Sequence, residues 1–310
     1  VTKSCMKKQR TWQRAFQKKL RLAIELHYCC LRLEYIIAFF GCLYAGMVAV
    51  PLYPPRRKDK HSRVAAVLKS CAAKVAIVGG DDHLDITAYL VEDEKLFDAG
   101  KVLNASELTE FTYPTEQLVD LQHNELAFLQ YTSGSTGIPK GVMISHTNIM
   151  ANVESLRQGT SGTRDDVFVN WLPLFHDLGL INTMLFPVYI GAHSVIMPSS
   201  HFAKKPYVWL KAISDYRGTI CGGPNFSFDL CCDSVSEEQL TTLDLSCWEI
   251  AYNAAEPIRV ETLRRFAEHF SPTGFQYSFL YPCYGMAEAT VFVTSIARKA
   301  GPVIRYFDHE

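Results

Sequence analysis

Apolar runs of strand length, bounded by Gly, Pro or polar residues, alternate along this chain with longer amphipathic stretches. The apolar runs predict buried strands at residues 47–52, 74–78, 125–131, 167–171, 193–197, 219–221, 248–252 and 279–281. The longer stretches predict helices at residues 63–72, 146–157, 207–216, 225–232 and 259–270. This alternation is typical of an α/β protein with mostly parallel sheets flanked by helices. In such sheets, ligands bind beyond the carboxyl ends of the strands.

One segment is apolar enough to raise the question of a membrane span. Residues 35–53 carry no charge and are nearly long enough to cross a bilayer. Gly41, Gly46 and Pro51 interrupt the segment, however, and Gly46 is suited to ending a helix. The pattern therefore predicts a helix followed by the short strand at residues 47–52, and no transmembrane span.

Composition and charge narrow the class of protein only slightly. Of the 310 residues, 48% are hydrophobic and 20% are charged, which is the balance of a soluble globular protein. The formal net charge is -1, so no global field indicates a nucleic-acid partner. The ten cysteines include no pair of Cys-x-x-Cys motifs, which argues against structural zinc and favours reduced thiols in the cytoplasm.

The first 32 residues form a basic segment of uncertain fold. Lys and Arg residues precede its first acid, Glu25, and no apolar core follows them as a signal peptide requires. A basic helix on the protein surface is the simplest interpretation, and docking to a membrane or nucleic acid is the alternative.

The most informative stretch is TSGSTGIPKG, at residues 132–141. It follows a predicted strand, and its glycines let the backbone turn tightly and approach a ligand. Its hydroxyl groups and Lys140 are suited to holding phosphate oxygens. Pro139 distinguishes it from a Walker A loop, which needs Gly before the Lys. A flexible linker is the alternative, but the strand-like VMIS that follows favours a phosphate-binding loop.

Five motifs in order give the chain a family resemblance. After the loop come WLPLFHDLGL at 171–180, GGPNFSFDLC at 222–231, NAAEPI at 253–258 and YPCYGMAEAT at 281–290. Together they resemble the adenylate-forming superfamily of acyl-CoA synthetases, peptide-synthetase adenylation domains and luciferases. LPLFHDLGL, AAEPI and YGMAEAT in combination are most similar to fatty acyl-AMP ligases. The fold implied is the large domain of these enzymes.

The resemblance implies a reaction and its participants. A fatty acid carboxylate would attack the α-phosphate of ATP, giving acyl-AMP and pyrophosphate, and an acyl-carrier protein would receive the acyl group. Lys140 would hold phosphate, Glu288 would bind Mg²⁺, and His176 would lie where the acyl chain meets the nucleotide. These three are the implied catalytic residues. By residue type alone, Glu288 could be a solvated acid, and His176 is more often a structural histidine than a catalytic one.

The resemblance also assigns binding residues. Contacts with the nucleotide are expected from Thr132, Ser133, Gly134, Ser135, Thr136, Gly137, Lys140, Asn253, Ala254, Ala255, Glu256, Pro257, Tyr284, Gly285 and Met286. Contacts with the fatty acid are expected from His176, Gly222, Gly223, Asn225 and Phe226. Tyr284 offers a flat face for adenine, but it is equally suited to core packing, as is Phe226.

The chain departs from the family pattern at both ends. The family's opening strand and Pro-Pro-Gly turn are not recognisable in the first 32 residues. The ribose-binding Asp, the hinge and the small domain with its catalytic Lys are not found after Glu288. Residues 33–310 are therefore expected to be a partial N-terminal adenylation domain with weak nucleotide binding and little turnover. The alternatives are a fatty acyl-CoA synthetase, a non-catalytic adenylate-binding module or, from residues 35–53, an integral membrane protein.

Overall fold

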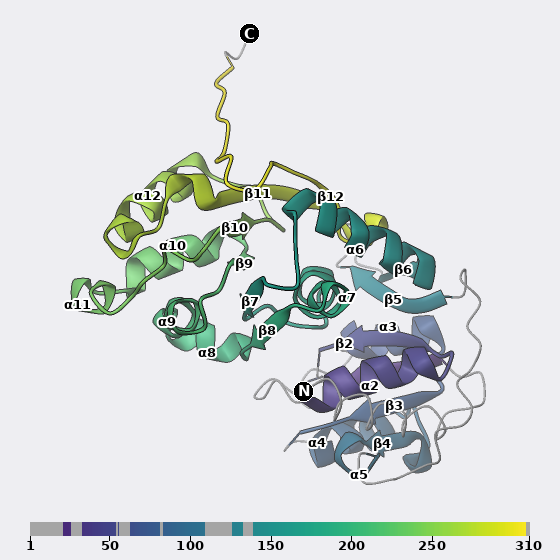
Figure 1. Ribbon diagram of the computed structural model, residues 1–310. Helices are drawn as coiled ribbons and strands as arrows, with labels where there is room; N and C mark the ends of the chain where they lie inside the picture. Colours follow the sequence, from purple (N-terminus) through teal and green to yellow (C-terminus); the bar gives the residue numbers. More distant parts are fainter. Residues whose placement is uncertain are drawn as a thin grey trace. The chain divides into compact units, whose positions relative to one another are not determined.

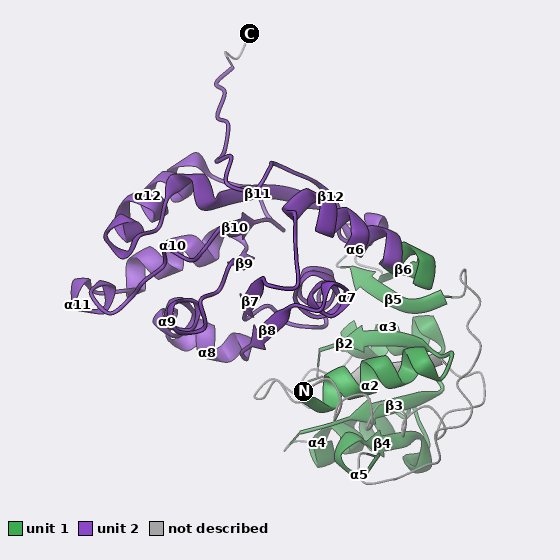
Figure 2. Ribbon diagram, in the orientation of Figure 1, with its two compact units in different colours: residues 1–149 green, residues 150–310 purple. Residues whose placement is uncertain are grey.

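The computed structural model describes residues 21–25, 33–53, 55, 63–80, 83–108, 126–132 and 139–307. The chain divides into two compact units, Val1–Ile149 and Met150–Glu310 (Figure 2). The boundary falls inside helix α6 (His146–Thr160), which begins in the first unit and continues in the second. Each unit has a sheet of its own (Figure 1).

The first unit is built on a mostly parallel sheet. Among the described residues its strands follow the order β4-β3-β1-β2-β5-β6. The strands are β1 (Arg21–Glu25), β2 (Val48–Leu52), β3 (Val75–Val78), β4 (Val102–Asn104), β5 (Leu126–Thr132) and β6 (Lys140–Ser145). Only β5 and β6 pair in the antiparallel sense. The helices are α2 (Leu33–Tyr44), α3 (Arg63–Cys71), α4 (His83–Ala88), α5 (Ala105–Leu108) and the short turns η1 (Tyr89–Asp93) and η2 (Ala99–Lys101).

The uncharged segment at 35–53 folds as a helix followed by a strand, which confirms the prediction. Helix α2 has 12 residues, about 18 Å at 1.5 Å per residue. Gly46 follows it with φ 68, a conformation that an L side chain would disfavour, and the chain then enters the buried strand β2. In the part of the chain that the structure describes, no helix has both the length and the apolarity needed to cross a membrane.

Strand β1 corrects one expectation. The family's opening strand was not recognisable in the sequence, yet Arg21–Glu25 forms a strand in the middle of the sheet. It pairs in parallel with β2 on one side, Leu22 opposite Ala49, and with β3 on the other, Leu22 opposite Val75. Five residues with a charge at each end give too weak a local pattern for prediction, because the pairing partners lie far along the chain.

The second unit also contains a mostly parallel sheet. Within the described range its strands follow the order β12-β11-β10-β9-β7-β8, and only β11 and β12 are antiparallel. The strands are β7 (Val167–Asn170), β8 (His193–Ile196), β9 (Ile220–Gly223), β10 (Ile250–Asn253), β11 (Leu280–Gly285) and β12 (Phe292–Ser295). The longer helices besides α6 are η3 (Leu178–Leu185), α9 (Tyr207–Tyr216), α10 (Asn225–Ser234) and α12 (Val260–Phe270). Shorter elements are α7 (Phe186–Ile190), α8 (Ser199–Lys204), α11 (Glu237–Leu240), η4 (Ser271–Thr273), η5 (Tyr277–Phe279) and η6 (Ala287–Ala289).

The α/β class and the predicted strands and helices are confirmed, with ends shifted by a few residues. Large aromatic side chains fill the core of the second unit. Trp209 and Trp248 are fully buried, with ring centroids 5.3 Å apart. Each indole N–H donates to a strand carbonyl, Trp209 to Val169 at 3.0 Å and Trp248 to Cys221 at 3.1 Å. The rings therefore anchor the sheet without leaving a buried donor unsatisfied.

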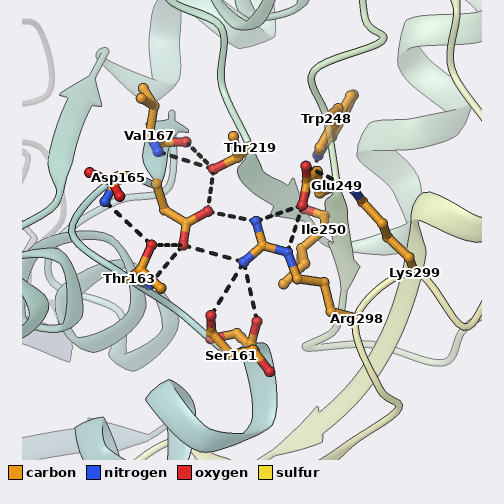
Figure 3. A network of polar contacts seen from close by, with 12 residues as sticks. Ser161, Thr163, Asp165, Val167, Thr219, Trp248, Glu249, Ile250, Arg298 and Lys299 are labelled. Atoms are coloured by element: carbon orange, nitrogen blue, oxygen red, sulfur yellow. Dashed lines mark hydrogen bonds and ion pairs between the residues drawn. The ribbon is translucent and has the colours of Figure 1, made fainter.

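A polar network joins the amino ends of three strands in this unit (Figure 3). Arg298 donates to Asp166, which precedes β7, at 2.7 Å, and to Glu249, which precedes β10, at 2.8 Å. Thr219, which precedes β9, donates to Asp166 at 2.8 Å, and Lys299 lies 2.8 Å from Glu249. Burial opposes ionisation of Asp166, but the bonds from Arg298, Thr163 and Thr219 outweigh it and lower its pKa.

Candidate active site

A pocket runs along the sheet of the second unit, between the sheet and α6. It encloses about 790 Å³ of empty space, open solvent at its mouth included. His176 and Tyr284 line its exposed end, and the buried side chains of Leu156, Ile220 and Ile250 line the other. Since Ile250 is one residue before the Ala251–Leu280 pair, Tyr284 lies about 16 Å further along the strands. The pocket is thus elongated, with polar groups at the carboxyl end of the sheet and apolar groups at depth.

The turn after β10 carries the NAAEPI motif and is held by hydrogen bonds to the start of α10. The Asn253 amide donates to Asn225 Oδ1 at 3.3 Å, and the Glu256 carboxylate accepts from the backbone N–H of Phe226 at 2.6 Å. Ala255 has φ 70, which is unfavourable for a residue with a Cβ. Ala254 and Ala255 line the pocket. The strained turn therefore presents its backbone to the pocket while its polar side chains hold it in place.

Asn253 also leaves an atom without a partner. Its side chain is fully buried, and Oδ1 has no hydrogen-bond partner among the described residues. A buried acceptor of this kind is costly unless it is satisfied. Asn253 itself does not line the pocket, although Tyr252 and Ala254 on either side of it do.

The turn between β11 and β12 carries the YGMAEAT motif. The Tyr284 side chain is 59% exposed and lines the pocket. Gly285 has no substitute here, because a Cβ would lie 1.9 Å from the carbonyl oxygen of Val291. Glu288 is exposed on the short turn η6 and makes no hydrogen bond or ion pair to any other described residue. Met286 is exposed and is not part of the pocket lining.

His176 and Asp177 form a pair at the mouth. The ring Nδ1 lies 2.6 Å from the Asp177 carboxylate, which also accepts from the backbone N–H of Leu178 at 2.7 Å and so caps η3. This hydrogen bond raises the pKa of His176, although partial burial acts in the opposite direction. With Nδ1 held by Asp177, Nε2 is the ring atom left for a ligand.

The fatty-acid residues expected from GGPNFSFDLC are placed differently. Gly222, Gly223, Asn225 and Phe226 do not line the pocket. A Cβ on Gly222 would lie 2.1 Å from the Tyr252 carbonyl oxygen, so this glycine permits close strand packing. Asn225 is a buried hub: its oxygen accepts from Asn253 and Arg259, and its amide donates to Thr262. Phe226 is half exposed at the start of α10.

The loop that the sequence predicts to bind phosphate belongs to the first unit. Thr132 ends β5 and Lys140 begins β6, and these two residues are paired across the hairpin. The expected contacts Ser133, Gly134, Ser135, Thr136 and Gly137 lie outside the described residues. The strands predicted on both sides of the loop are confirmed.

Sequence reasoning missed several residues that line the pocket: Leu156, Asn182, Ile220, Ile250, Tyr252, Cys283 and Phe292. A signal for some of them was available. Ile250, Tyr252 and Ala254 alternate along one strand, as do Tyr281, Cys283 and Gly285, so each set faces one side of the sheet. Burial raises the pKa of the Cys283 thiol to about 12, which leaves it protonated at neutral pH.

The protein is an α/β protein with a pocket that opens at the carboxyl end of a mostly parallel sheet, where such folds bind ligands. A family profile described as AMP-binding enzyme matches residues 27–305, and the chain belongs to that family. Among curated relatives, the medium-chain fatty acid–acyl-carrier-protein ligase JamA of Moorena producens is 38% identical over 266 residues, covering 85% of this chain and 45% of the relative. The long-chain fatty acid–AMP ligase FadD26 of Mycobacterium bovis is 33% identical over 316 residues, covering 97% of this chain and 54% of the relative.

Solved structures agree with these relatives. A fatty acid AMP ligase from Legionella pneumophila matches with a TM-score of 0.86 and 33% identity, covering 96% of this chain and 51% of that one. A second structure, a fatty acyl-adenylate ligase from L. pneumophila in complex with acyl adenylate and pyrophosphate, matches with a TM-score of 0.85 and 34% identity, at the same coverage. The resemblance to fatty acyl-AMP ligases is confirmed. The chain spans about half the length of the curated relatives it matches.

Proposed function

We propose that this protein activates a fatty acid with ATP, giving fatty acyl-AMP and pyrophosphate. The observation that carries the proposal is the elongated pocket, with His176, Ala255 and Tyr284 at its mouth and Leu156 and Ile250 at depth. A polar mouth suits an adenylate, and an apolar interior suits an alkyl chain. The relatives named as fatty acid ligases support the same reaction.

In this proposal, adenine lies between two backbone turns. Ala254 and Ala255 would contact one face and Tyr284 the other, with the backbone of Gly285, which also lines the pocket, beside them. His176, oriented by Asp177, would direct Nε2 to the junction of acyl chain and phosphate. Asn253, Glu256 and Pro257 would support the turn rather than contact the base.

The pyrophosphate is assigned to the loop after β5. Thr132, Ser133, Gly134, Ser135, Thr136, Gly137 and Lys140 are the proposed contacts. Backbone N–H groups, hydroxyls and one ammonium are the donors suited to a leaving pyrophosphate, and catalysis of such transfers is mainly positioning and charge stabilisation.

Glu288 is the proposed ligand for Mg²⁺. Its carboxylate is exposed and unengaged by other described residues, so it is available to a cation. No group of three or more His, Cys, Asp or Glu residues that could hold a metal occurs within the described ranges. One carboxylate fits Mg²⁺, which usually keeps several waters and binds substrate phosphates. When bound, the ion would neutralise charge on the phosphates.

The proposed acceptor of the acyl group is an acyl-carrier protein. The relatives JamA and TtuA, from Moorena producens and Teredinibacter turnerae, are named as ligases of fatty acids to that carrier. The alternative is CoA, since a relative from Mycobacterium leprae at 32% identity is named a putative fatty-acid–CoA ligase. Offering both acceptors to protein charged with dodecanoyl-AMP separates the two.

The proposal is tested by crystals of the chain with a non-hydrolysable dodecanoyl-adenylate analogue, together with calorimetric titration. We expect the base at Tyr284 and the alkyl chain along Ile250 toward Leu156. Absence of binding in solution, or a ligand that leaves this pocket empty, would overturn the proposal.

A further inference from the structure

One buried side chain of α6 holds the turn between β11 and β12. The Asn152 amide nitrogen donates to the carbonyl oxygens of Ala289 and Phe292, each at 3.0 Å. Its oxygen accepts from the backbone N–H of Phe292 at 3.1 Å. Asn152 is 8% exposed and lies about 140 positions before the turn in sequence. Both of its donors and its acceptor therefore bind the backbone of one distant loop.

This turn contains strained backbone. Thr290 has φ 74 and ψ -59, the geometry of the rare γ-turn with positive φ, and it is a β-branched residue. The turn's own bonds include Met286 N–H to Val291 O at 2.9 Å and Thr290 N–H to Ala287 O at 2.9 Å. Strained conformations persist only where surrounding structure enforces them, and Asn152 supplies that enforcement from outside the turn.

The turn and α6 form two walls of the same pocket. Val291 and Phe292 line it from the turn, and Leu156, one helical turn after Asn152, lines it from α6. Glu288 and Gly285 belong to the same compact turn. A bond network between these walls therefore fixes the width of the pocket and the position of Glu288 together.

We infer that Asn152 is a positioning residue of the acyl-adenylate site, acting through the turn at 285–292. The inference rests on the proposed function. Only a carboxamide on this short stem offers two N–H donors to two carbonyls and an oxygen to one N–H; Asp has no donors when ionised. Asn152 itself does not line the pocket, so it would act through the turn.

The test compares Asn152→Ala with two controls in the intact chain. Gln158→Ala removes another carboxamide of α6, one that is exposed and donates only to Glu154. Ser236→Ala removes the side-chain cap of α11 and so destabilises the same unit, although α11 contributes no residue to the pocket lining. Affinity for the dodecanoyl-adenylate analogue is measured by calorimetry, and exchange of the Phe292 amide by hydrogen–deuterium exchange.

We expect Asn152→Ala to bind the analogue roughly 10-fold more weakly, as supporting groups of binding sites typically do when removed. Exchange at Phe292 should accelerate, and both controls should keep wild-type affinity. Asn152→Asp gives a second readout: an ionised carboxylate facing two carbonyl oxygens is disfavoured, so its pKa should rise. Its affinity should then recover as the pH falls, because the protonated acid can donate again.

Three outcomes overturn the inference. Wild-type affinity in Asn152→Ala means that the turn needs no support from α6, and the proposed function then stands alone. An equal loss in Ser236→Ala means that general destabilisation explains the effect. If the wild-type chain fails to bind the analogue, both the proposed function and this inference fall.

Discussion

The amino and carboxyl ends of the strands in the second unit differ in how well their buried polar groups are hydrogen-bonded. At the amino ends of β7, β9 and β10, hydrogen bonds connect the three strands (Figure 3). Asp166 accepts from Thr219 and from Arg298, and Arg298 also donates to Glu249. At the carboxyl ends, Asn170 and Asn253 are fully buried and each keeps one polar atom without a partner in the described structure.

This difference separates stability from function along three short strands. Each unsatisfied buried polar atom costs about 1–3 kcal/mol, so the carboxyl end is built at the expense of stability. Proteins break such local rules mainly at functional sites. The amino end holds the sheet together, whereas the carboxyl end, with the strained turns at Ala255 and Thr290, would receive the adenylate in the proposed function.

The largest expected effect is at the amino ends of the strands, where the polar network lies. Arg298→Ala leaves Asp166, whose side chain is 4% exposed, without its cation, and should lower the free energy of unfolding by about 3–5 kcal/mol. Urea denaturation of the second unit measures this loss. Lys299→Ala is the matched control, because Lys299 is half exposed and its bond to Glu249 should contribute less than about 1 kcal/mol. Similar losses in both variants would contradict the comparison.

Acid should lower the stability that the polar network at the amino ends of the strands contributes. The folded protein lowers the pKa of Asp166 and of Glu249, so their contribution to stability is complete above the ordinary carboxyl pKa of about 4. It is lost as the pH falls through the lowered values of the folded state. We would measure denaturation midpoints from pH 7 down to pH 2, a range on both sides of about 4. As the pH falls, the midpoint should decline less steeply in Arg298→Ala than in the wild type. Parallel declines would show that other groups dominate.

A smaller effect is expected at the carboxyl ends of the strands, and it should alter ligand binding rather than stability. Tyr284→Ala removes an exposed ring proposed to stack on adenine, which should weaken binding of the adenylate analogue by about 1–2 kcal/mol, roughly 10-fold. The unfolding midpoint should stay within experimental error. Tyr216→Ala, another exposed tyrosine of the second unit, is the control and should bind normally. Equal affinity in both variants would remove Tyr284 from the site.

The smallest effect concerns backbone strain. Ala255→Gly relieves a positive φ and should stabilise the chain by about 0.5–1 kcal/mol, because the Cβ penalty exceeds the extra entropy of glycine. Ala72, with φ 49, permits the same substitution in the first unit, outside the motif turn. We expect both variants to gain stability and only Ala255→Gly to change binding of the analogue. A loss of stability at Ala255 would show that the turn is not strained.

Prediction from the sequence succeeded where the signal was local. The strands, the longer helices and the turns at Ala255 and Tyr284 follow from short apolar runs and contiguous motifs. It failed where the partners are distant. Strand β1 depends on pairing with β2 and β3, and the Arg298–Asp166 bond joins residues 132 positions apart. No local pattern encodes such contacts, because they exist only once the sheet has formed.

The candidate site divides in the same way. Motif membership placed His176 and Tyr284 at one pocket, but it could not find Leu156 or Phe292, which reach the pocket through the packing of α6 and β12. It also assigned Asn225 to the ligand, whereas the structure engages this side chain in hydrogen bonds between α10, α12 and the motif turn. A motif indicates which residues lie near the site. Which of those side chains line the cavity depends on the packing of the surrounding helices and strands.

The buried indoles have a spectroscopic consequence. Of the four tryptophans in the chain, Trp171, Trp209 and Trp248 all belong to the second unit, and the described part of the first unit contributes none. Each is shielded from water, so its emission should shift to longer wavelength when the surrounding core opens. Intrinsic fluorescence is therefore expected to report mainly on melting of the second unit, whereas circular dichroism averages over both units.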